Sequence, residues 1–340
     1  MPISRSNSRI IGITMGDPGG ISPEVTLKAL AKRNVWNKAK KGIFHTFFVC
    51  IGSPEIYEEA KRVTGARVRF NVVDCVDLAV LDEDAVNVLD IGDDVAEVIV
   101  GKVAMANAVL SYHALNVGTQ LAMNGCINAL VTGSINKEAV QLVLPGFTGH
   151  TEFLAEKAGV KNVKMLLQGG PLRVILVTTH VALAQVSERV NSKNVYSAIE
   201  SAHRFLKKYA KIKSPKIAVC GLNPHCGEGG KIGNEESTKI MPAIKKALKE
   251  NINVTGPLPA DTVFYAAVKG VYDAVVVMYH DQGLGPLKTI AFDDCVNISL
   301  NLPYVRTSPA HGTAFDIAYQ NIANPESMIV AIKTAIEYTQ

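Results

Sequence analysis

Short runs of β-branched and other aliphatic residues recur along this 340-residue chain, and longer amphipathic stretches separate them. Such alternation is typical of βαβ units, in which a helix carries the chain from one parallel strand to the next. Aromatic residues are only 6% of the chain, so aliphatic side chains must fill the core, as in sheets covered on both faces. We therefore predict an α/β fold with strands at 10–15, 44–51, 68–73, 127–132, 163–167, 173–178, 216–220, 274–278 and 296–300, and helices at 23–31, 102–123, 137–143, 195–209, 237–249 and 327–338.

Length, charge and cysteine usage narrow the class of protein. A chain of 340 residues fits two domains better than one. The net charge of +4 is small and the densest basic stretch, residues 207–213, fits a solvated helix face, so we expect no nucleic-acid partner. No apolar run is long enough to span a membrane, residues 1–9 lack the apolar core of a signal peptide, and the six cysteines show no CxxC spacing. These features predict a cytoplasmic protein with reduced thiols and no membrane partner.

Three of the eight histidines occupy one kind of position, just past the end of a predicted strand. His180 follows strand 173–178, His225 follows strand 216–220, and His280 follows strand 274–278. Parallel strands of one sheet end at the same edge, so these imidazoles are expected to gather there. Three imidazoles that leave coordination positions open form a catalytic metal site for Zn²⁺, Co²⁺ or a similar ion. Any one of them alone fits a hydrogen-bonded polar group at a strand end equally well.

Two glycine-containing loops lead from a strand into a helix. In the second, Thr148-Gly149-His150-Thr151-Glu152, the His150 and Thr151 side chains would stand beside free N–H groups at a helix start, a suitable place for phosphate or carboxylate. Thr148 or Thr151 is expected to cap that helix. The first loop, residues 14–24, is neither GxGxxG nor a P-loop, and an ordinary turn with Ser22 as N-cap explains it as well as an anion site does.

Cationic and amide side chains follow His280 along the chain, namely Lys288, Asn297 and Arg306. An arginine binds carboxylate or phosphate through two parallel hydrogen bonds, and a desolvated lysine can act as an acid or a base. We therefore take all three as candidate substrate-binding residues and Lys288 also as a candidate catalytic residue. Solvated charges on surface loops are the alternative interpretation.

With these residues assembled, the chain resembles the 4-hydroxythreonine-4-phosphate dehydrogenase family of vitamin B6 biosynthesis over almost its whole length. The motifs that carry the resemblance are Gly16-Asp17-Pro18, Gly149-His150-Thr151-Glu152, Asn223-Pro224-His225, Gly256-Pro257-Leu258-Pro259-Ala260-Asp261-Thr262, Tyr279-His280-Asp281-Gln282, Arg306-Thr307-Ser308 and His311-Gly312-Thr313-Ala314.

The resemblance implies a two-domain fold like that of isocitrate and isopropylmalate dehydrogenases, with the active site in the interdomain cleft. We expect the first α/β domain at 1–141 and 316–340 and the second at 142–315. It also implies a homodimer with a shared active site. The family's metal triad falls on His180, His225 and His280, the last supplied by the other subunit, and its substrate contacts fall on five residues: His150, Thr151, Lys288, Asn297 and Arg306.

The activity that the resemblance implies is oxidation of a small phosphorylated hydroxy acid with NAD or NADP and a divalent metal (Zn, Mg or Co), followed by decarboxylation to 3-amino-2-oxopropyl phosphate. A sister branch acts on D-threonate or D-erythronate 4-phosphate with the same motifs. Ser22, Ser134 and Ala310 depart from the residues usual in the family, Gly, Pro and Asp. From other classes, a phosphate-binding regulatory protein without activity and a metal-dependent hydrolase remain alternatives.

Overall fold

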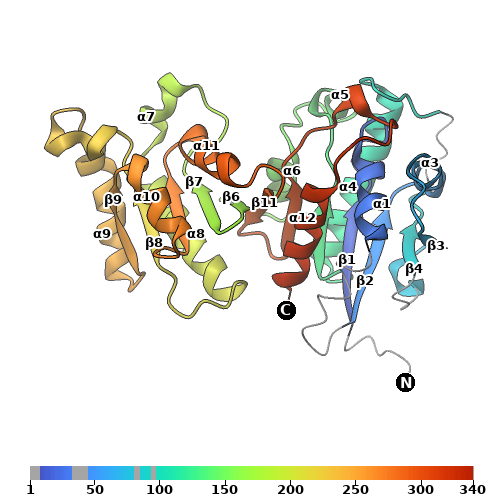
Figure 1. The fold of residues 1–340 in the computed structure, drawn as a ribbon, viewed down its shortest axis with the longest axis horizontal. Coiled ribbons are helices and arrows are strands. Elements are labelled where there is room, and N and C mark those ends of the chain that lie inside the picture. The colour runs from blue at the N-terminus through green and yellow to red at the C-terminus, as the bar shows by residue number, and fades with distance from the viewer. Residues whose placement is uncertain (1–7, 33–44, 80–84, 93–96, 340) are drawn as a thin grey trace. The chain divides into compact units, whose positions relative to one another are not determined.

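The computed structural model describes residues 8–32, 45–79, 85–92 and 97–339. The chain divides into two compact units (Figure 1): the first comprises residues 1–160 and 302–340, and the second comprises residues 161–301. The division expected from the sequence places the two crossings at 141/142 and 315/316 instead. No helix in the described ranges is long and apolar enough to cross a membrane.

The first unit is built on parallel strands in the order β3-β4-β2-β1-β5-β12. Their aliphatic side chains form the core: Ile11 and Ile13 of β1 and Val49 of β2 are fully buried. The strands are β1 (Ser8–Thr14), β2 (His45–Ile51), β3 (Arg69–Val73), β4 (Ala85–Leu89), β5 (Ala129–Thr132) and β12 (Val305–Pro309).

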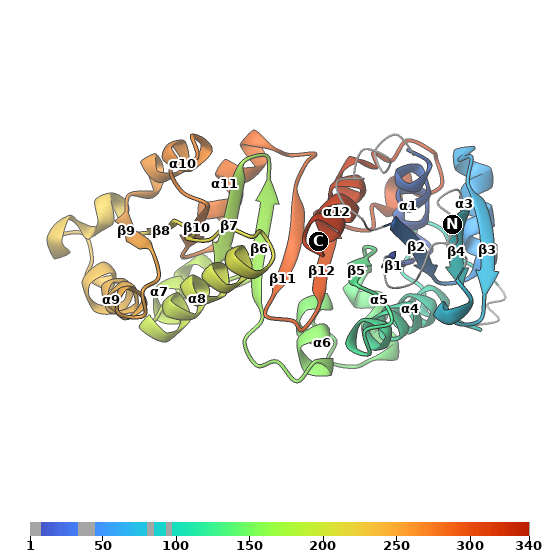
Figure 2. The ribbon, with the colours of Figure 1, turned by 90° about the horizontal axis from the view of Figure 1, so that it is seen from below.

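Helices cover both faces of this sheet, as βαβ crossovers require. Figure 2 shows α1 and α12 on one side of the strands and α4 and α5 on the other. The helices of the first unit are α1 (Ser22–Ala31), α3 (Pro54–Thr64), α4 (Met105–Met123), α5 (Lys137–Val143), α6 (His150–Lys157) and α12 (Glu326–Glu337).

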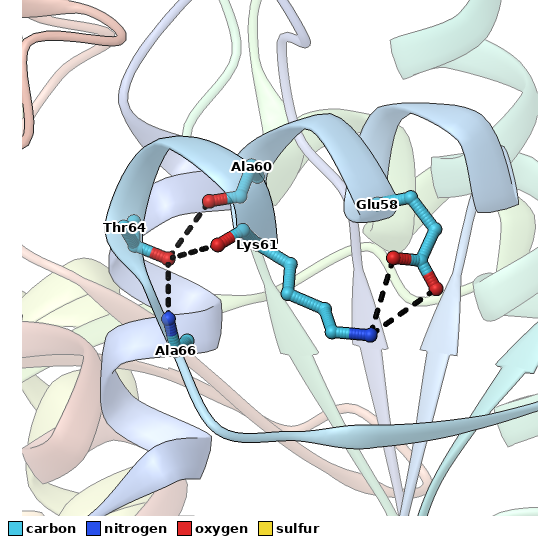
Figure 3. Close-up of polar contacts among 5 residues, drawn as sticks. All are labelled: Glu58, Ala60, Lys61, Thr64 and Ala66. Carbon is cyan, nitrogen blue, oxygen red and sulfur yellow. Dashed lines mark hydrogen bonds and ion pairs between the residues drawn. The ribbon is translucent and has the colours of Figure 1, made fainter.

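Helix α3 shows how local sequence fixes the ends of an element. Ser53 is its N-cap, since the hydroxyl accepts a hydrogen bond from the Ile56 N–H, and Pro54 occupies the first turn. At the other end (Figure 3) the Thr64 hydroxyl donates to the Ala60 carbonyl over 2.8 Å and accepts from the Ala66 N–H. Gly65 then takes a left-handed φ of 63°, which ends the helix at low steric cost.

The second unit has the strand order β11-β6-β7-β10-β8-β9. Strands β7, β10, β8 and β9 run parallel, whereas β6 is antiparallel to both β7 and β11. The direction of β6 follows from its connection: only Gly170 and Pro171 join it to β7, and a parallel partner would need a crossover of about a dozen residues. The strands are β6 (Lys164–Gly169), β7 (Leu172–Leu176), β8 (Ile217–Cys220), β9 (Val254–Leu258), β10 (Ala274–Val277) and β11 (Val296–Leu300).

Helices also lie on both faces of the second sheet, with α8 and α9 on one side and α10 and α11 on the other in Figure 2. The regular helices are α7 (Val186–Arg189), α8 (Ser192–Lys208), α9 (Met241–Lys249), α10 (Ala260–Val268) and α11 (His280–Ile290), and a π-helical turn, Glu236–Ile240, precedes α9.

All nine predicted strands are present, so the α/β prediction is confirmed; Phe44, the first residue of one prediction, lies outside the described residues. Three strands, β4, β9 and β12, were missed. Strand β12 carries an arginine, a threonine, a serine and a proline yet is buried throughout, and β9 contains a glycine and a proline. Strand β6 departs from the parallel order of βαβ units, because it is antiparallel to both of its neighbours.

Candidate metal and substrate site

The three predicted metal-ligating histidines follow three neighbouring parallel strands of the second unit. Strand β10 lies between β7 and β8, with Val276 opposite Ile175 of β7 and opposite Val219 of β8. His180 follows β7, His280 follows β10 and His225 follows β8, so all three come from the same edge of this sheet. The three strands therefore end at one edge of the sheet, where the sequence predicts these imidazoles.

His180 and His280 lie side by side. The pairing of β7 with β10 continues past the strand ends, because Thr178 donates from its N–H and its hydroxyl to the Met278 carbonyl over 3.2 and 2.7 Å. The two imidazole centroids are 5.7 Å apart with their planes tilted by 44°. Two rings at this separation can both turn a nitrogen towards one ion.

His280 and His225 each have a carboxylate on the Nδ1 side of the ring. His280 Nδ1 is 2.7 Å from Asp281 Oδ1, and His225 Nδ1 is 2.8 Å from Glu228 Oε1. A carboxylate accepts, so Nδ1 carries the proton and the Nε2 lone pair remains for a metal; this is the usual outer partner of a metal-bound histidine. The Glu228 carboxylate, with a smaller contribution from Asp261, raises the pKa of His225 above its usual value.

The donor chemistry of these residues fits a divalent metal, since imidazoles oriented by carboxylates suit Zn²⁺ or Co²⁺. Within the described ranges, no three His, Cys, Asp or Glu side chains of one chain gather closely enough to hold an ion among them. His225 is strongly exposed and contacts Glu228, whereas His180 and His280 contact each other. Coordination of one metal ion by all three histidines therefore stays a prediction.

A buried cationic cluster in the first unit contains two of the predicted substrate residues, Arg306 and His150. Arg306 on β12 is 1% exposed, and its Nη2 donates to the Thr132 hydroxyl. Burial lowers the pKa of Arg306 to about 10, which leaves it charged at neutral pH. Burial, then the charges of Arg306 and Lys137, hold the pKa of His150 well below its usual value, so the imidazole is neutral.

In this cluster, His150 Nε2 and the Tyr304 hydroxyl are buried without a hydrogen-bond partner among the residues that the structure describes. Buried polar atoms ordinarily have partners, and an orphaned one needs an explanation. Burial raises the pKa of the Tyr304 phenol to about 12, and the nearby charge of Arg306 opposes this shift. A bound phosphate or carboxylate would neutralise the arginine and hydrogen-bond both orphaned atoms.

Lys137 belongs to this cluster and was missed by the sequence analysis. It is the first residue of α5, and an ideal Cβ on Gly149 would lie 3.3 Å from its Nζ. Gly149 has a φ of 149° and forms the N-cap of α6, so the expectation of a threonine cap is wrong. His150 and Thr151 are then the first two residues of that helix, where backbone N–H groups are free for an anion.

Lys288 and Asn297 lie in the second unit, apart from this cluster in sequence. Lys288 is half-buried in the last turn of α11, with Nζ 5.6 Å from the centre of the Phe292 ring. Asn297 lies on β11, and its Oδ1 is buried without a hydrogen-bond partner in the described part of the chain. This amide oxygen can therefore accept a hydrogen bond from a ligand.

Two of the three departures from the family pattern meet at one histidine. The Ser134 hydroxyl donates to the His311 carbonyl over 2.9 Å, and Ala310 immediately precedes that histidine. Ser22 is the first residue of α1, with Ile21 at the N-cap, so its expected capping role is wrong. The Ser22 side chain instead packs against the turn that follows β5. A Cβ on Gly133, in that turn, would lie 2.3 Å from the Ser22 hydroxyl.

Comparison with solved structures shows which known folds this chain resembles. The fold, at 12% identity, resembles that of a β-decarboxylating dehydrogenase from Thermococcus kodakarensis with a TM-score of 0.50, covering 95% of this chain and 81% of that one. A crystal structure of a 4-hydroxythreonine-4-phosphate dehydrogenase from Burkholderia phymatum matches far more closely, with a TM-score of 0.85 and 36% identity over 97% of this chain and 98% of that one.

Sequence relatives point the same way. A 4-hydroxythreonine-4-phosphate dehydrogenase of Geobacter metallireducens is 42% identical over 96% of this chain and 94% of its own length. A D-threonate 4-phosphate dehydrogenase of Pectobacterium atrosepticum is 38% identical over 97% of this chain and 99% of its own length. The model of the family described as pyridoxal phosphate biosynthetic protein PdxA matches residues 44–335. The chain belongs to this family, and the predicted family and fold are confirmed.

Proposed function

We propose that this chain is a metal-dependent, NAD(P)-linked dehydrogenase that oxidises 4-hydroxythreonine 4-phosphate and decarboxylates the product to 3-amino-2-oxopropyl phosphate. The observation that carries the proposal is the set of His180, His225 and His280 at one edge of adjacent parallel strands. The chain also belongs to a family whose members include 4-hydroxythreonine-4-phosphate dehydrogenases. Oxidation of the alcohol to a ketone requires the carbon to lose a hydride, for which NAD(P) would supply the acceptor, and the hydroxyl to lose its proton to the protein or solvent.

The three histidines would hold the metal. Nε2 would be the donor atom of His280 and His225, because Asp281 and Glu228 occupy the Nδ1 side of these two rings. When bound, a divalent ion supplies Lewis acidity, which lowers the pKa of the substrate hydroxyl and polarises the developing ketone. We propose Zn²⁺, Mg²⁺ or Co²⁺ as the ion.

His150, Thr151 and Arg306 bind the anionic substrate groups in this proposal. Arg306 is buried and charged and can offer a planar fork to a phosphate or carboxylate. His150 adds a neutral imidazole with an orphaned Nε2, and Thr151 adds a hydroxyl and a free N–H at the start of α6. The same contacts orient the substrate, since a bound anion fixes the distance to its reacting carbon.

Lys288 and Asn297 complete the proposed set. Asn297 offers its Oδ1 to a substrate donor. Lys288 carries the proton transfers: it takes the proton of the substrate hydroxyl and returns one to the carbon from which carbon dioxide departs. The hydride acceptor would be NAD or NADP.

The proposed assembly is a homodimer with a shared active site, in which His280 of the partner subunit joins His180 and His225. The alternative arrangement takes all three ligands from one chain. The 5.7 Å between the ring centroids of His180 and His280 within a chain favours this alternative. We also propose a cytoplasmic location, because all six cysteines are free thiols and Cys75 and Cys126 are exposed.

The sister activity on D-threonate or D-erythronate 4-phosphate is the second candidate, favoured by the D-threonate 4-phosphate dehydrogenase relative. The substrates of the two branches differ at the carbon next to the carboxylate, which carries an ammonium in one and a hydroxyl in the other. After oxidation and loss of carbon dioxide, the first gives an amino ketone phosphate and the second gives a hydroxy ketone phosphate.

A substrate panel tests the proposal. The protein is stripped of metal, reconstituted separately with Zn²⁺, Mg²⁺ and Co²⁺, and assayed with NAD⁺ and NADP⁺ for reduced nicotinamide and for carbon dioxide. The proposal predicts the highest kcat/KM on 4-hydroxythreonine 4-phosphate. A higher kcat/KM on D-threonate or D-erythronate 4-phosphate would assign the sister activity, and no reduced nicotinamide with any substrate and metal would contradict both.

A further inference from the structure

The turn that carries His225 has an unusual backbone. Five successive residues, from His225 to Gly229, have φ between 44° and 78°, and three of them, including His225, are not glycine. L-residues avoid this left-handed region because Cβ crowds the following carbonyl. Such a conformation persists only where surrounding contacts over-determine it.

Glu236 supplies the contacts at the entrance of this turn. Its buried carboxylate accepts hydrogen bonds from the N–H groups of Leu222 and Asn223 through Oε1, over 2.8 and 2.7 Å. Its Oε2 accepts from Asn223 Nδ2 over 3.0 Å. The turn also packs on the carboxylate, because a Cβ on Gly227 would lie 2.8 Å from Glu236 Oε2. Glu236 is therefore an anchor that contacts both the residues before the turn and the turn itself.

Glu235 connects the same anchor to the segment that follows His180. Its Oε2 accepts the other hydrogen bond of Asn223 Nδ2, over 2.8 Å, and its Oε1 accepts from the Ser187 hydroxyl over 2.6 Å. Ser187 lies on α7, seven residues after His180, and its carbonyl accepts from Lys239 Nζ over 2.7 Å. Both glutamates and Lys239 lie on or beside the π-helical turn, an irregularity often found at functional sites.

We propose that Glu235 and Glu236 are positioning residues that hold the His225 turn in its left-handed form and fix it relative to the His180 segment. The inference rests on the proposed metal role of His180 and His225. A carboxylate is required at position 236 because the three groups that hydrogen-bond to it are all donors. A glutamine there would turn its own N–H₂ towards either the Asn223 amide or the two backbone N–H groups.

The test compares Glu236→Gln with wild type in the full-length protein. Glu250→Gln is the matched control, since Glu250 accepts a hydrogen bond from Tyr196 in the same unit. Hydrogen exchange of the Leu222 and Asn223 amides is measured without metal, and Co²⁺ affinity is measured by titration of the metal-free protein. We expect faster exchange at both amides and a Co²⁺ Kd raised about 10–100-fold in Glu236→Gln, with both quantities unchanged in the control.

Each outcome decides something. Unchanged exchange in Glu236→Gln overturns the positioning claim, and faster exchange with an unchanged Co²⁺ Kd overturns its link to the metal. If the wild-type protein binds no Co²⁺, the metal proposal fails while exchange still tests the anchor. Should Glu236→Gln not fold, Ser187→Ala removes the hydrogen bond that ties Glu235 to the His180 segment, while Lys239 still bonds the backbone carbonyl of residue 187. A several-fold rise in the Co²⁺ Kd supports the proposal, and an unchanged Kd overturns the role of Glu235.

Discussion

The imidazole rings of His180 and His280 lie 5.7 Å apart, centroid to centroid, at the ends of two adjacent parallel strands of one chain. In the proposed homodimer, His280 instead completes the metal site of the other subunit. Both arrangements use the same three histidines, but they differ in which chain supplies the third ligand.

Mixing two inactive variants separates these arrangements. In a shared site, His180→Ala and His280→Ala chains that exchange subunits form mixed dimers in which one site regains all three histidines. Random exchange of equal amounts makes half of the dimers mixed, so about a quarter of wild-type turnover should return. The control is subunit exchange confirmed independently, for example with two differently tagged chains. No recovery despite exchange would place all three ligands in one chain.

Arg306→Lys tests direct anion binding by the buried guanidinium. Lysine keeps the charge but cannot reproduce the planar fork, so we expect kcat/KM to fall about 10–100-fold, equivalent to about 1.4–2.7 kcal/mol. The exposed Arg62, which pairs with Glu59 on α3, gives the matched control Arg62→Lys, for which no change is expected. Unchanged KM and kcat in Arg306→Lys would exclude the contact.

Lys137→Met tests whether this lysine acts on the His150 site. Lys137 is one of the charges that lower the pKa of His150, so its removal should raise that pKa, as measured by NMR titration of the imidazole. The substrate KM should rise at the same time, because a cation beside the bound anion is lost. Lys157→Met, at the other end of α6, serves as the control. An unmoved His150 pKa would remove Lys137 from the cluster.

Asp17 makes stability depend on pH. Burial raises the pKa of its carboxyl to about 6, and the N–H groups of Gly19 and Asn136 oppose the shift. A carboxyl with a raised folded-state pKa stabilises the fold below its unfolded pKa, near 3.8, and loses that contribution as pH rises through 6. Relative to Asp17→Asn, the wild type should therefore lose about 2–3 kcal/mol of unfolding free energy between pH 4 and pH 8, measured by denaturant titration. A constant difference across this range would contradict the assignment.

The sequence predicts the strand-end histidines because parallel strands must share an edge, and the structure has β7, β10 and β8 as neighbours. It misses β12, whose polar residues resemble a loop until burial against β5 is known. Lys137 is missed for a related reason: its approach to His150 depends on how the chain between α5 and α6 folds. The left-handed turn of His225 is equally hidden, since that backbone depends on contacts made in the folded chain, such as those of Glu236.

Stoichiometric metal binding tests the central claim, that His180, His225 and His280 form one catalytic metal site. Metal-free protein is titrated with Co²⁺, and the three single His→Ala variants are compared with His113→Ala, a histidine on α4 in the other unit. We predict one Co²⁺ per subunit for wild type and His113→Ala. Each of the three variants should lose both Co²⁺ binding and turnover while keeping wild-type circular dichroism. Full Co²⁺ affinity in any one of the three would contradict the account.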